Sequence, residues 1–289
     1  MTKKGEFNMK IKITSDSTCD LNHLVEERDI GIMPLQVHLE EKSYRDGVDI
    51  IPQDIFDFVA KTKILPKTSA PSVGEYEEFF QEQLQGNDYV IHFNISSKSS
   101  GSHNFALNAA EKFGKKVRVI DSKALSSGQG LLVLKAADMR DSGKTVDEIV
   151  AAVNELRDHV NTSFVPDQLD YLHKGGRCSG MTMFVANALK IHPKIVMNDG
   201  QLMQGGKYRG HMERCISQYV NDLKEMYPDY DKTRCFITHS SAEKELVDVA
   251  RAKVQELFSF DEVIETVAGS IITSHCGKGT LGVLFIYNK

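Results

Sequence analysis

The stretch VIHFNI, residues 90–95, is almost continuously apolar, and the polar run SSKSSGS, residues 96–102, follows it directly. An apolar stretch of this length is typical of a strand that is buried on both faces of a parallel sheet. A helical pattern begins near His103, so the polar run is predicted to connect a strand to the N-terminus of a helix. Hydroxyls, backbone N–H groups and the helix dipole favour an anion at such a turn, with plain helix capping as the alternative.

Four further apolar stretches resemble the first, and helical patterns separate most of them. They lie at residues 11–14, 117–120, 234–238 and 281–286, and all are predicted to be buried parallel strands. Helices are expected to begin after Ser72 and at two capping boxes, Thr145 with Glu148 and Ser240 with Glu243. Strands that alternate with helices in this way predict an α/β architecture.

The pattern becomes less regular in the second half. Residues 161–180 contain a proline and a Gly-Gly turn instead of a helical repeat, and Asn198-Asp199-Gly200 is typical of a tight hairpin. We therefore predict two domains. The first is an N-terminal α/β domain with a parallel sheet over residues 9–165, and the second is a C-terminal α+β domain over residues 166–289. Some segments are expected to cross between them.

The composition is that of an ordinary globular protein, with 289 residues, 41% apolar and 26% charged. A net charge of -5 argues against a general affinity for nucleic acid or for an anionic membrane. No apolar run approaches the roughly 18 residues that span a bilayer.

The five cysteines are scattered and never spaced as CxxC, which favours reduced thiols and a cytoplasmic location. Residues 1–8 lack a signal-peptide pattern and read as a tail, with Met9 as the expected native start.

Three other polar clusters lie at the edges of apolar segments. Thr68 and Ser69 precede the predicted helix cap, which does not account for their hydroxyls. A Gly-Gly pair allows close backbone approach and leaves Arg177 able to grip a carboxylate or a phosphate. His275 is followed by two glycines, which suit a ligand that comes close to the backbone. Each cluster has a structural alternative, but together they indicate an anion site without a metal.

The order of these clusters is similar to that of the DegV family of bacterial fatty-acid-binding proteins. The matching motifs are ITSDSTCDL at residues 13–21, TSxPS at 68–72, SSxxSG at 96–101, KGGR at 174–177 and HxGxG at 275–279. The resemblance covers residues 9–289. The sequence departs from the family pattern at Ala70, Ser99, Ser102 and His103, and the hydroxyl donors survive these changes.

The resemblance implies a two-domain carrier that holds one long-chain fatty acid, such as palmitate, stearate or oleate, between its domains. It implies no cofactor and no catalytic activity. The ligand contacts that it carries over are Thr68, Ser69, Ser100, Gly101, Arg177 and His275. Family members present the acid to a separate fatty acid kinase subunit, which phosphorylates the carboxylate with ATP and so feeds phospholipid synthesis.

Other classes of function fit the residues less well. A serine hydrolase could use Ser100 as nucleophile and His275 as base, but it would favour a GxSxG elbow and an acidic partner for the histidine. Neither can be assigned in this sequence. A phosphotransferase with its own nucleotide site would need a phosphate loop, which the sequence lacks. An interaction module without a ligand is the third alternative.

Overall fold

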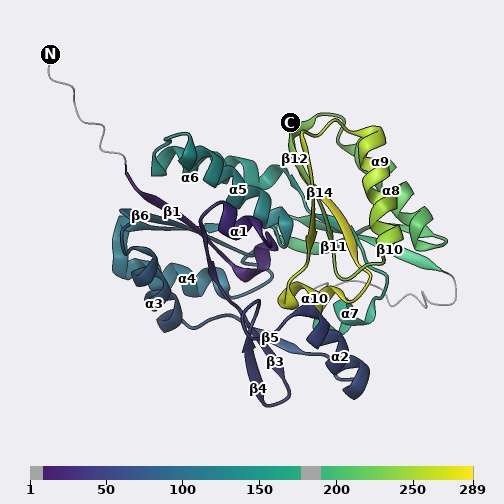
Figure 1. Ribbon diagram of the computed structural model, residues 1–289, viewed down its shortest axis with the longest axis horizontal. Helices are drawn as coiled ribbons and strands as arrows, with labels where there is room; N and C mark the ends of the chain where they lie inside the picture. The colour runs from purple at the N-terminus through teal and green to yellow at the C-terminus, as the bar shows by residue number, and fades with distance from the viewer. Residues whose placement is uncertain (1–8, 177–189, 289) are drawn as a thin grey trace.

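The structure, a computed structural model, describes residues 9–176 and 190–288. Its first half is built on a four-stranded sheet with the order β2-β1-β6-β7, in which every neighbouring pair is parallel (Figure 1). The strands are β1 (Ile11–Asp16), β2 (Ile30–Met33), β6 (Tyr89–Asn94) and β7 (Val117–Asp121). The parallel strands predicted at residues 11–14, 90–95 and 117–120 are confirmed.

Helices cover both faces of this sheet. One face carries α3 (Val73–Gln83), α4 (Ser102–Ala110) and the 3-10 helix η2 (Glu111–Lys116), and the other carries α5 (Ser127–Asp141) and α6 (Val146–Leu156). Neighbouring residues of β6 pack on opposite sides, because side chains alternate along a strand. Val90 joins the core beneath α3 and α4, whereas Ile91 and Phe93 join the core beneath α5 and α6. Both faces are therefore buried, which explains the continuous apolar stretch.

The second half contains a larger sheet with the order β11-β10-β9-β14-β12-β13, and β8 also pairs with β14. Its helices α8 (Met212–Met226) and α9 (Lys244–Leu257) pack against one face through a core of their own (Figure 1). The strands are β8 (Val160–Asn161), β9 (Ser163–Val165), β10 (Ile191–Asn198), β11 (Gln201–Arg209), β12 (Tyr230–His239), β13 (Glu262–Val267) and β14 (Leu281–Tyr287). The predicted combination of a parallel-sheet α/β domain and an α+β domain is confirmed.

Strand direction in this second sheet differs from the prediction. β12 is parallel to β13 but antiparallel to β14, and β14 is antiparallel to all three of its neighbours. The prediction of a parallel strand at residues 281–286 is therefore wrong. Burial on both faces makes a strand apolar whatever the direction of its neighbours. β8 and β9 precede residue 166 and belong to this second sheet. The domain boundary between residues 165 and 166 stays a prediction.

A third, three-stranded sheet extends from the first half toward the second. It has the order β4-β3-β5 and consists of β3 (Gln36–Leu39), β4 (Lys42–Arg45) and β5 (Lys67–Ser69), with α2 (Pro52–Thr62) inserted before β5. Its neighbour is α10 (Ser270–Cys276), which in turn contacts α7 (Asp170–Gly175) (Figure 1). Val37 of β3 and Ile55 of α2 share a small core with Ile271 of α10. This contact brings β5 next to α10.

The remaining short elements are η1 (Ser17–Cys19), α1 (Leu24–Glu27) and η3 (Arg157–His159).

Helix α5 lies between the two large sheets. Its residues Leu131 and Leu134 share one core with Ile13 of the first sheet and with Phe236 and Leu284 of the second. Ten of its residues are buried, so it has no polar face of the kind that marks a surface helix. The two halves are therefore joined by a continuous apolar core.

Two of the predicted helix starts are confirmed and one is wrong. Ser72 and Thr145 each accept a hydrogen bond from the amide three residues on, in complete capping boxes. Ser240 does not cap α9, because its hydroxyl pairs with the Thr273 hydroxyl at 3.0 Å and the helix begins only at Lys244. Asp16 caps the short helix η1.

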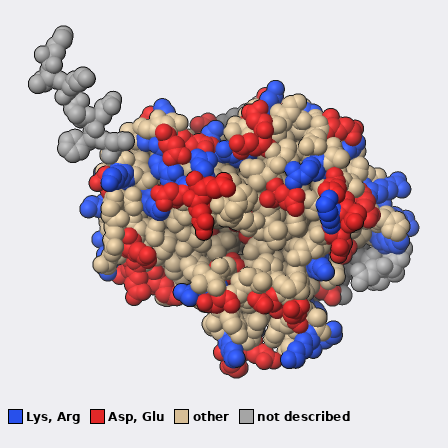
Figure 2. Space-filling view, viewed as in Figure 1, with Lys and Arg blue, Asp and Glu red and all other residues tan. Residues whose placement is uncertain are grey.

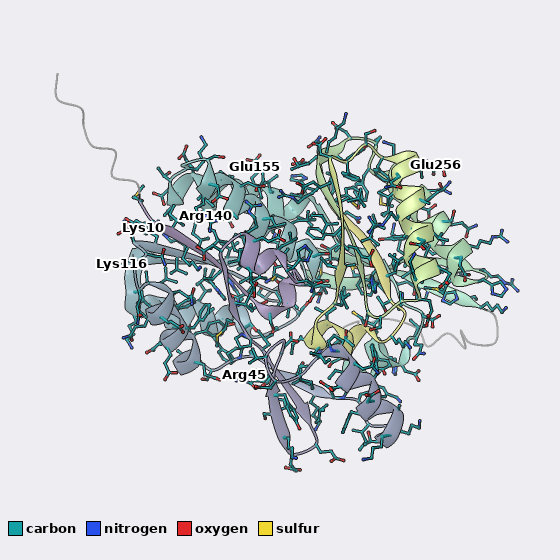
Figure 3. All side chains as sticks on the ribbon, in the orientation of Figure 1. Lys10, Arg45, Lys116, Arg140, Glu155 and Glu256 are labelled. Carbon is teal, nitrogen blue, oxygen red and sulfur yellow. The ribbon has the colours of Figure 1, made fainter. Side chains whose placement is uncertain are left out.

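Charged side chains such as Lys116 and Glu256 lie on the outside (Figure 3). Both signs of charge are intermixed over the upper part of the face in Figure 2, and the hollowed centre of that face is largely uncharged. The four cysteines that the structure describes are buried. No helix within the described ranges is long and apolar enough to cross a membrane.

Candidate functional site

The Ser- and Gly-rich turn follows β6 at the carboxyl end of the parallel sheet. The amides of Ser99 and Ser100 both donate to the Ser96 carbonyl, at 2.9 and 3.2 Å, and this closes the turn. The Ser100 hydroxyl lies 2.9 Å from the Ser102 hydroxyl and accepts a hydrogen bond from the Ser102 amide at 3.2 Å. The turn therefore presents the Ser100 side chain just before the first residue of α4.

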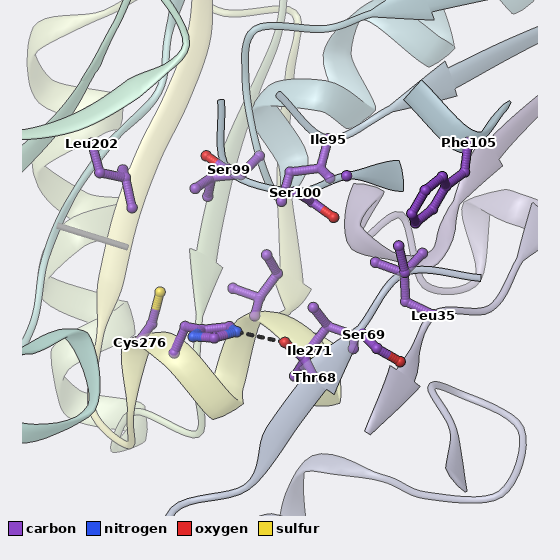
Figure 4. A pocket seen from close by; sticks show the side chains of 15 residues that line it. Leu35, Thr68, Ser69, Ile95, Ser99, Ser100, Phe105, Leu202, Ile271 and Cys276 are labelled. Carbon is purple, nitrogen blue, oxygen red and sulfur yellow. Dashed lines mark hydrogen bonds between the residues drawn. The ribbon is translucent and has the colours of Figure 1, made fainter. Parts of the chain in front are cut away.

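The second polar contribution comes from β5 and α10. The Thr68 hydroxyl lies 2.9 Å from Nε2 of His275, although 207 residues separate them in sequence (dashed in Figure 4). Both side chains line the same cavity as Ser100. The structure thus brings together three of the residues that the sequence indicated.

The position of His275 depends on two buried carboxylates at the other end of α10. Asp20 accepts a hydrogen bond from the Gly269 amide and Asp46 accepts one from the Ser270 amide, each at 2.8 Å. The first amides of a helix have no partner within the helix, and the carboxyl oxygens that accept from them here come from the first half of the chain. Burial raises the pKa of Asp20 to about 8 and also raises the pKa of Asp46. The contacts hold the helix that carries His275 against the first half.

The Gly-Gly run of the sequence lies beside His275. A Cβ atom added at Gly175 would be 2.7 Å from Nδ1 of His275, closer than real side chains approach. Gly176 ends α7 with a φ of 68°, as a glycine after a helix commonly does. Gly175 is therefore the residue type that lets α7 pack against this imidazole. Arg177 lies outside the described residues, so its predicted contact with the ligand stays a prediction.

A cavity of about 220 Å³ lies between these elements. Apart from the hydroxyls and the imidazole, its walls are mostly apolar, and they come from both halves of the chain. The apolar lining residues are Leu35, Ala70, Ile95, Phe105, Leu125, Leu202, Ile271, Ile272 and Cys276. A second cavity of about 30 Å³ shares Leu125, Ile272 and Cys276 with the first. The cavity therefore has one polar end, and its other walls are mostly apolar.

The other two sequence-predicted contacts line the cavity in a different way. Ser69 is adjacent to Thr68, but its hydroxyl pairs with Nε2 of His38 at 2.8 Å and points away from Ser100 in Figure 4. Gly101 contributes backbone only, and the Phe105 ring packs over the position where a Cβ would lie. These two residues shape the wall more than they offer hydroxyl or imidazole groups to a ligand.

A hairpin closes one side of the cavity. Its turn has positive φ at Asp199 and Gly200, 44° and 77°, which confirms the predicted tight turn. The Ser96 hydroxyl donates to the Gly200 carbonyl at 2.7 Å, and the Lys98 ammonium lies 2.7 Å from the Asp199 carboxylate. The hairpin in this way places Leu202 in the wall. Nothing in the local sequence around Leu202 indicated this role, because it depends on a contact between distant segments.

The geometry does not reproduce a serine hydrolase dyad. A nucleophilic serine needs a hydrogen bond to its base. In the described structure His275 pairs with Thr68 through Nε2, while Ser100 pairs with Ser102. Within residues 9–176 and 190–288, no group of three or more His, Cys, Asp or Glu side chains could hold a metal ion.

Comparison with known proteins agrees with the motif order. Residues 10–288 match the family described as "Uncharacterised protein, DegV family". A DegV domain-containing protein of Caldanaerobacter subterraneus subsp. tengcongensis is 33% identical over 278 residues, which cover 96% of this chain and 98% of that protein.

Solved structures show the same fold. A DegV family protein from Thermus thermophilus, described as binding fatty acid, has a TM-score of 0.90 and 28% identity over 97% of this chain and 100% of that chain. A stearic acid-binding protein from Eubacterium ventriosum has a TM-score of 0.81 and 29% identity over 96% of this chain and 98% of that chain. The chain belongs to the DegV family.

Proposed function

We propose that the chain binds one long-chain fatty acid, such as palmitate, stearate or oleate, with its carboxylate at Thr68, Ser100 and His275. One observation carries this proposal: these three side chains form the polar end of a cavity whose other walls are mostly apolar. A carboxylate is ionised at pH 7 and is costly to bury without donors. Hydroxyls and an imidazole can supply them. The fatty acid binding described for the Thermus and Eubacterium proteins supports the same ligand class.

The acyl chain accounts for most of the affinity in this proposal. At about 0.8 kcal/mol per buried methylene, the roughly 14 methylenes of palmitate contribute about 11 kcal/mol. Association costs several kcal/mol of this. A Kd in the micromolar range, about -8 kcal/mol, is therefore within reach. The tail supplies affinity and the head group sets orientation.

The tail has a natural direction along the apolar walls. Leu125, Ile272 and Cys276 line both the main cavity and the smaller one. We place the tail past these three side chains, between the segment that precedes α5 and α10. The smaller cavity is narrow, so bulky substitutions there are expected to shorten the acids that bind.

A partner kinase completes the proposed role. The family resemblance supports a cytoplasmic carrier that has no catalytic activity of its own and presents the carboxylate to a separate fatty acid kinase subunit. Arg177 is proposed to serve either the head group or the partner-facing surface. The Arg177→Ala variant should impair palmitate binding or acyl phosphate formation by the kinase with ATP, and normal values for both would remove this residue from the proposal.

Extraction of the purified protein with organic solvent, followed by mass spectrometry, tests the ligand. The proposal expects a long-chain fatty acid in about one-to-one ratio with the protein. If no acid is extracted and the stripped protein binds no palmitate, the proposed function is wrong. A fluorophosphonate probe distinguishes the hydrolase alternative, because it should leave Ser100 unlabelled in a carrier.

A further inference from the structure

Helix α10 forms a large part of the cavity wall. Its lining residues are Ile271, Ile272, His275 and Cys276. A helix of seven residues has few hydrogen bonds of its own, so contacts from other elements must fix its ends. Asp20 and Asp46 hold the N-terminal end. The position of the His275 imidazole therefore also depends on what holds the C-terminal end.

The ring of Tyr171 lies on the C-terminal end of α10. This helix is followed by Gly277, whose φ of 78° favours glycine. A Cβ atom added at Gly277 would lie 2.7 Å from Cδ2 and 2.9 Å from Cγ of Tyr171, closer than real side chains approach. Only 7% of Tyr171 is exposed. The tyrosine ring and the backbone of Gly277 are therefore in direct contact, and a side chain at residue 277 would push the two apart.

The two glycines after His275 suit a ligand that comes close to the backbone, but side chains of the protein itself take this place. Gly277 is covered by Tyr171, and a Cβ atom added at Gly279 would lie 2.9 Å from Cβ of Asp167. Tyr171 belongs to α7 and Asp167 lies just before this helix. The glycines therefore let α7 and the residues before it pack on the end of α10.

Two further residues of α7 contact the last turn of α10 or share its core. Gly175 lies against Nδ1 of His275, as the added Cβ atom shows. Leu172 is 0% exposed and belongs to the same core cluster as the cavity-lining residues Ile272 and Cys276. Because the interior is close-packed, these contacts and the Tyr171 ring fix how far the end of α10 extends toward Thr68.

We propose that Tyr171 is a positioning residue, which holds the end of α10 so that Nε2 of His275 faces Thr68 and the head group of the ligand. The inference rests on the proposed function. Tyr171 lines neither cavity, so its effect on a ligand passes through α10. A hydrogen bond weakens steeply when its distance and angle change, and bonds to an ionised group are the strong ones. A displaced imidazole should therefore weaken the binding of an acid more than that of a neutral analogue.

The test compares the binding of palmitate with that of hexadecanol, the matched neutral ligand, in variants of Tyr171. Tyr171→Ala removes the ring and should raise the Kd for palmitate about 5- to 10-fold, while the Kd for hexadecanol stays within about twofold. Tyr171→Phe keeps the ring and removes only the hydroxyl, so it should bind both ligands like the wild type.

A double-mutant cycle with His275→Ala tests whether Tyr171 acts through the imidazole. His275→Ala should itself weaken palmitate binding relative to hexadecanol binding, because the head group loses one contact. In this background Tyr171→Ala should leave the ratio of the two Kd values unchanged. Tyr230 supplies the control, because it is 6% exposed and lies in the separate core beneath α8 and α9. Tyr230→Ala should leave the same ratio unchanged in the wild-type background.

The possible outcomes separate the two levels of the proposal. Equal loss of palmitate and hexadecanol in Tyr171→Ala, or an undiminished selective loss in the His275→Ala background, overturns the inference and leaves the proposed function standing. A loss in Tyr171→Phe as large as that in Tyr171→Ala overturns it as well. If the stripped wild-type protein binds no palmitate, both fail. Thermal unfolding checks that each variant is folded, and Tyr171→Leu, a smaller change with the same expected selective loss, decides the question if Tyr171→Ala is not.

Discussion

The Thr68→Val substitution tests the head-group site with little change in side-chain volume. Thr68 lies on β5 and its hydroxyl pairs with Nε2 of His275 at 2.9 Å. The variant removes this hydroxyl from the polar end of the cavity, so a bound carboxylate would lose one donor. A hydrogen bond to a charged group contributes about 1.5–3 kcal/mol, which corresponds to a Kd about 10- to 100-fold higher.

The assay is isothermal titration calorimetry, which gives the Kd of the ligand-stripped protein for palmitate and, separately, for hexadecanol. The loss should be confined to the acid, because the tail contacts are unchanged in the variant. Thr233→Val is the matched control, since Thr233 is an exposed residue of β12 that does not line the cavity. An unchanged Kd for palmitate in Thr68→Val, or an equal loss for acid and alcohol, would refute the assignment of Thr68 to the carboxylate.

Three further predictions follow from the same geometry. Gly175→Ala places a Cβ within 2.7 Å of the His275 ring, so the imidazole must move. This displacement should weaken palmitate binding about tenfold. Unchanged binding together with an unchanged unfolding temperature would contradict this prediction. Ser69→Ala should raise the Kd for palmitate by less than about threefold, because the Ser69 hydroxyl already pairs with His38. A loss of affinity as large as that in Thr68→Val would instead mean that Ser69 contacts the ligand. The pKa of Asp20 is raised to about 8 in the folded protein, so this carboxyl group ionises near pH 4 only when the chain is unfolded. The free energy of unfolding, measured in urea, should therefore fall between about pH 4 and pH 8. Asp20→Asn should make that fall shallower, and an unaltered slope would count against the raised pKa.

Local patterns predicted those elements whose signals are local. The capping boxes at Ser72 and Thr145 are formed as expected, because both partners lie within four residues of each other. The hairpin at Asp199 and Gly200 is formed for the same reason. The box at Ser240 failed because a distant residue, Thr273, takes its hydroxyl, and no local pattern reports such a competitor.

Features that depend on the assembled fold could not be predicted in the same way. α5 lacks the polar side that reveals an amphipathic helix, because it is buried between two sheets. β14 has the apolar stretch of a parallel strand and is antiparallel to its neighbours. The motif order predicted that Thr68, Ser100 and His275 lie together, whereas the contact of Gly175 with the imidazole becomes visible only when α7 lies on α10.

The most direct test of the account is a crystal structure of this protein with palmitate bound. The account predicts carboxylate oxygens within about 3.2 Å of the Thr68 and Ser100 hydroxyls, with the acyl chain along Leu125 and Ile272. A carboxylate bound elsewhere, or a methyl end of the acid against Thr68 and Ser100, would contradict it.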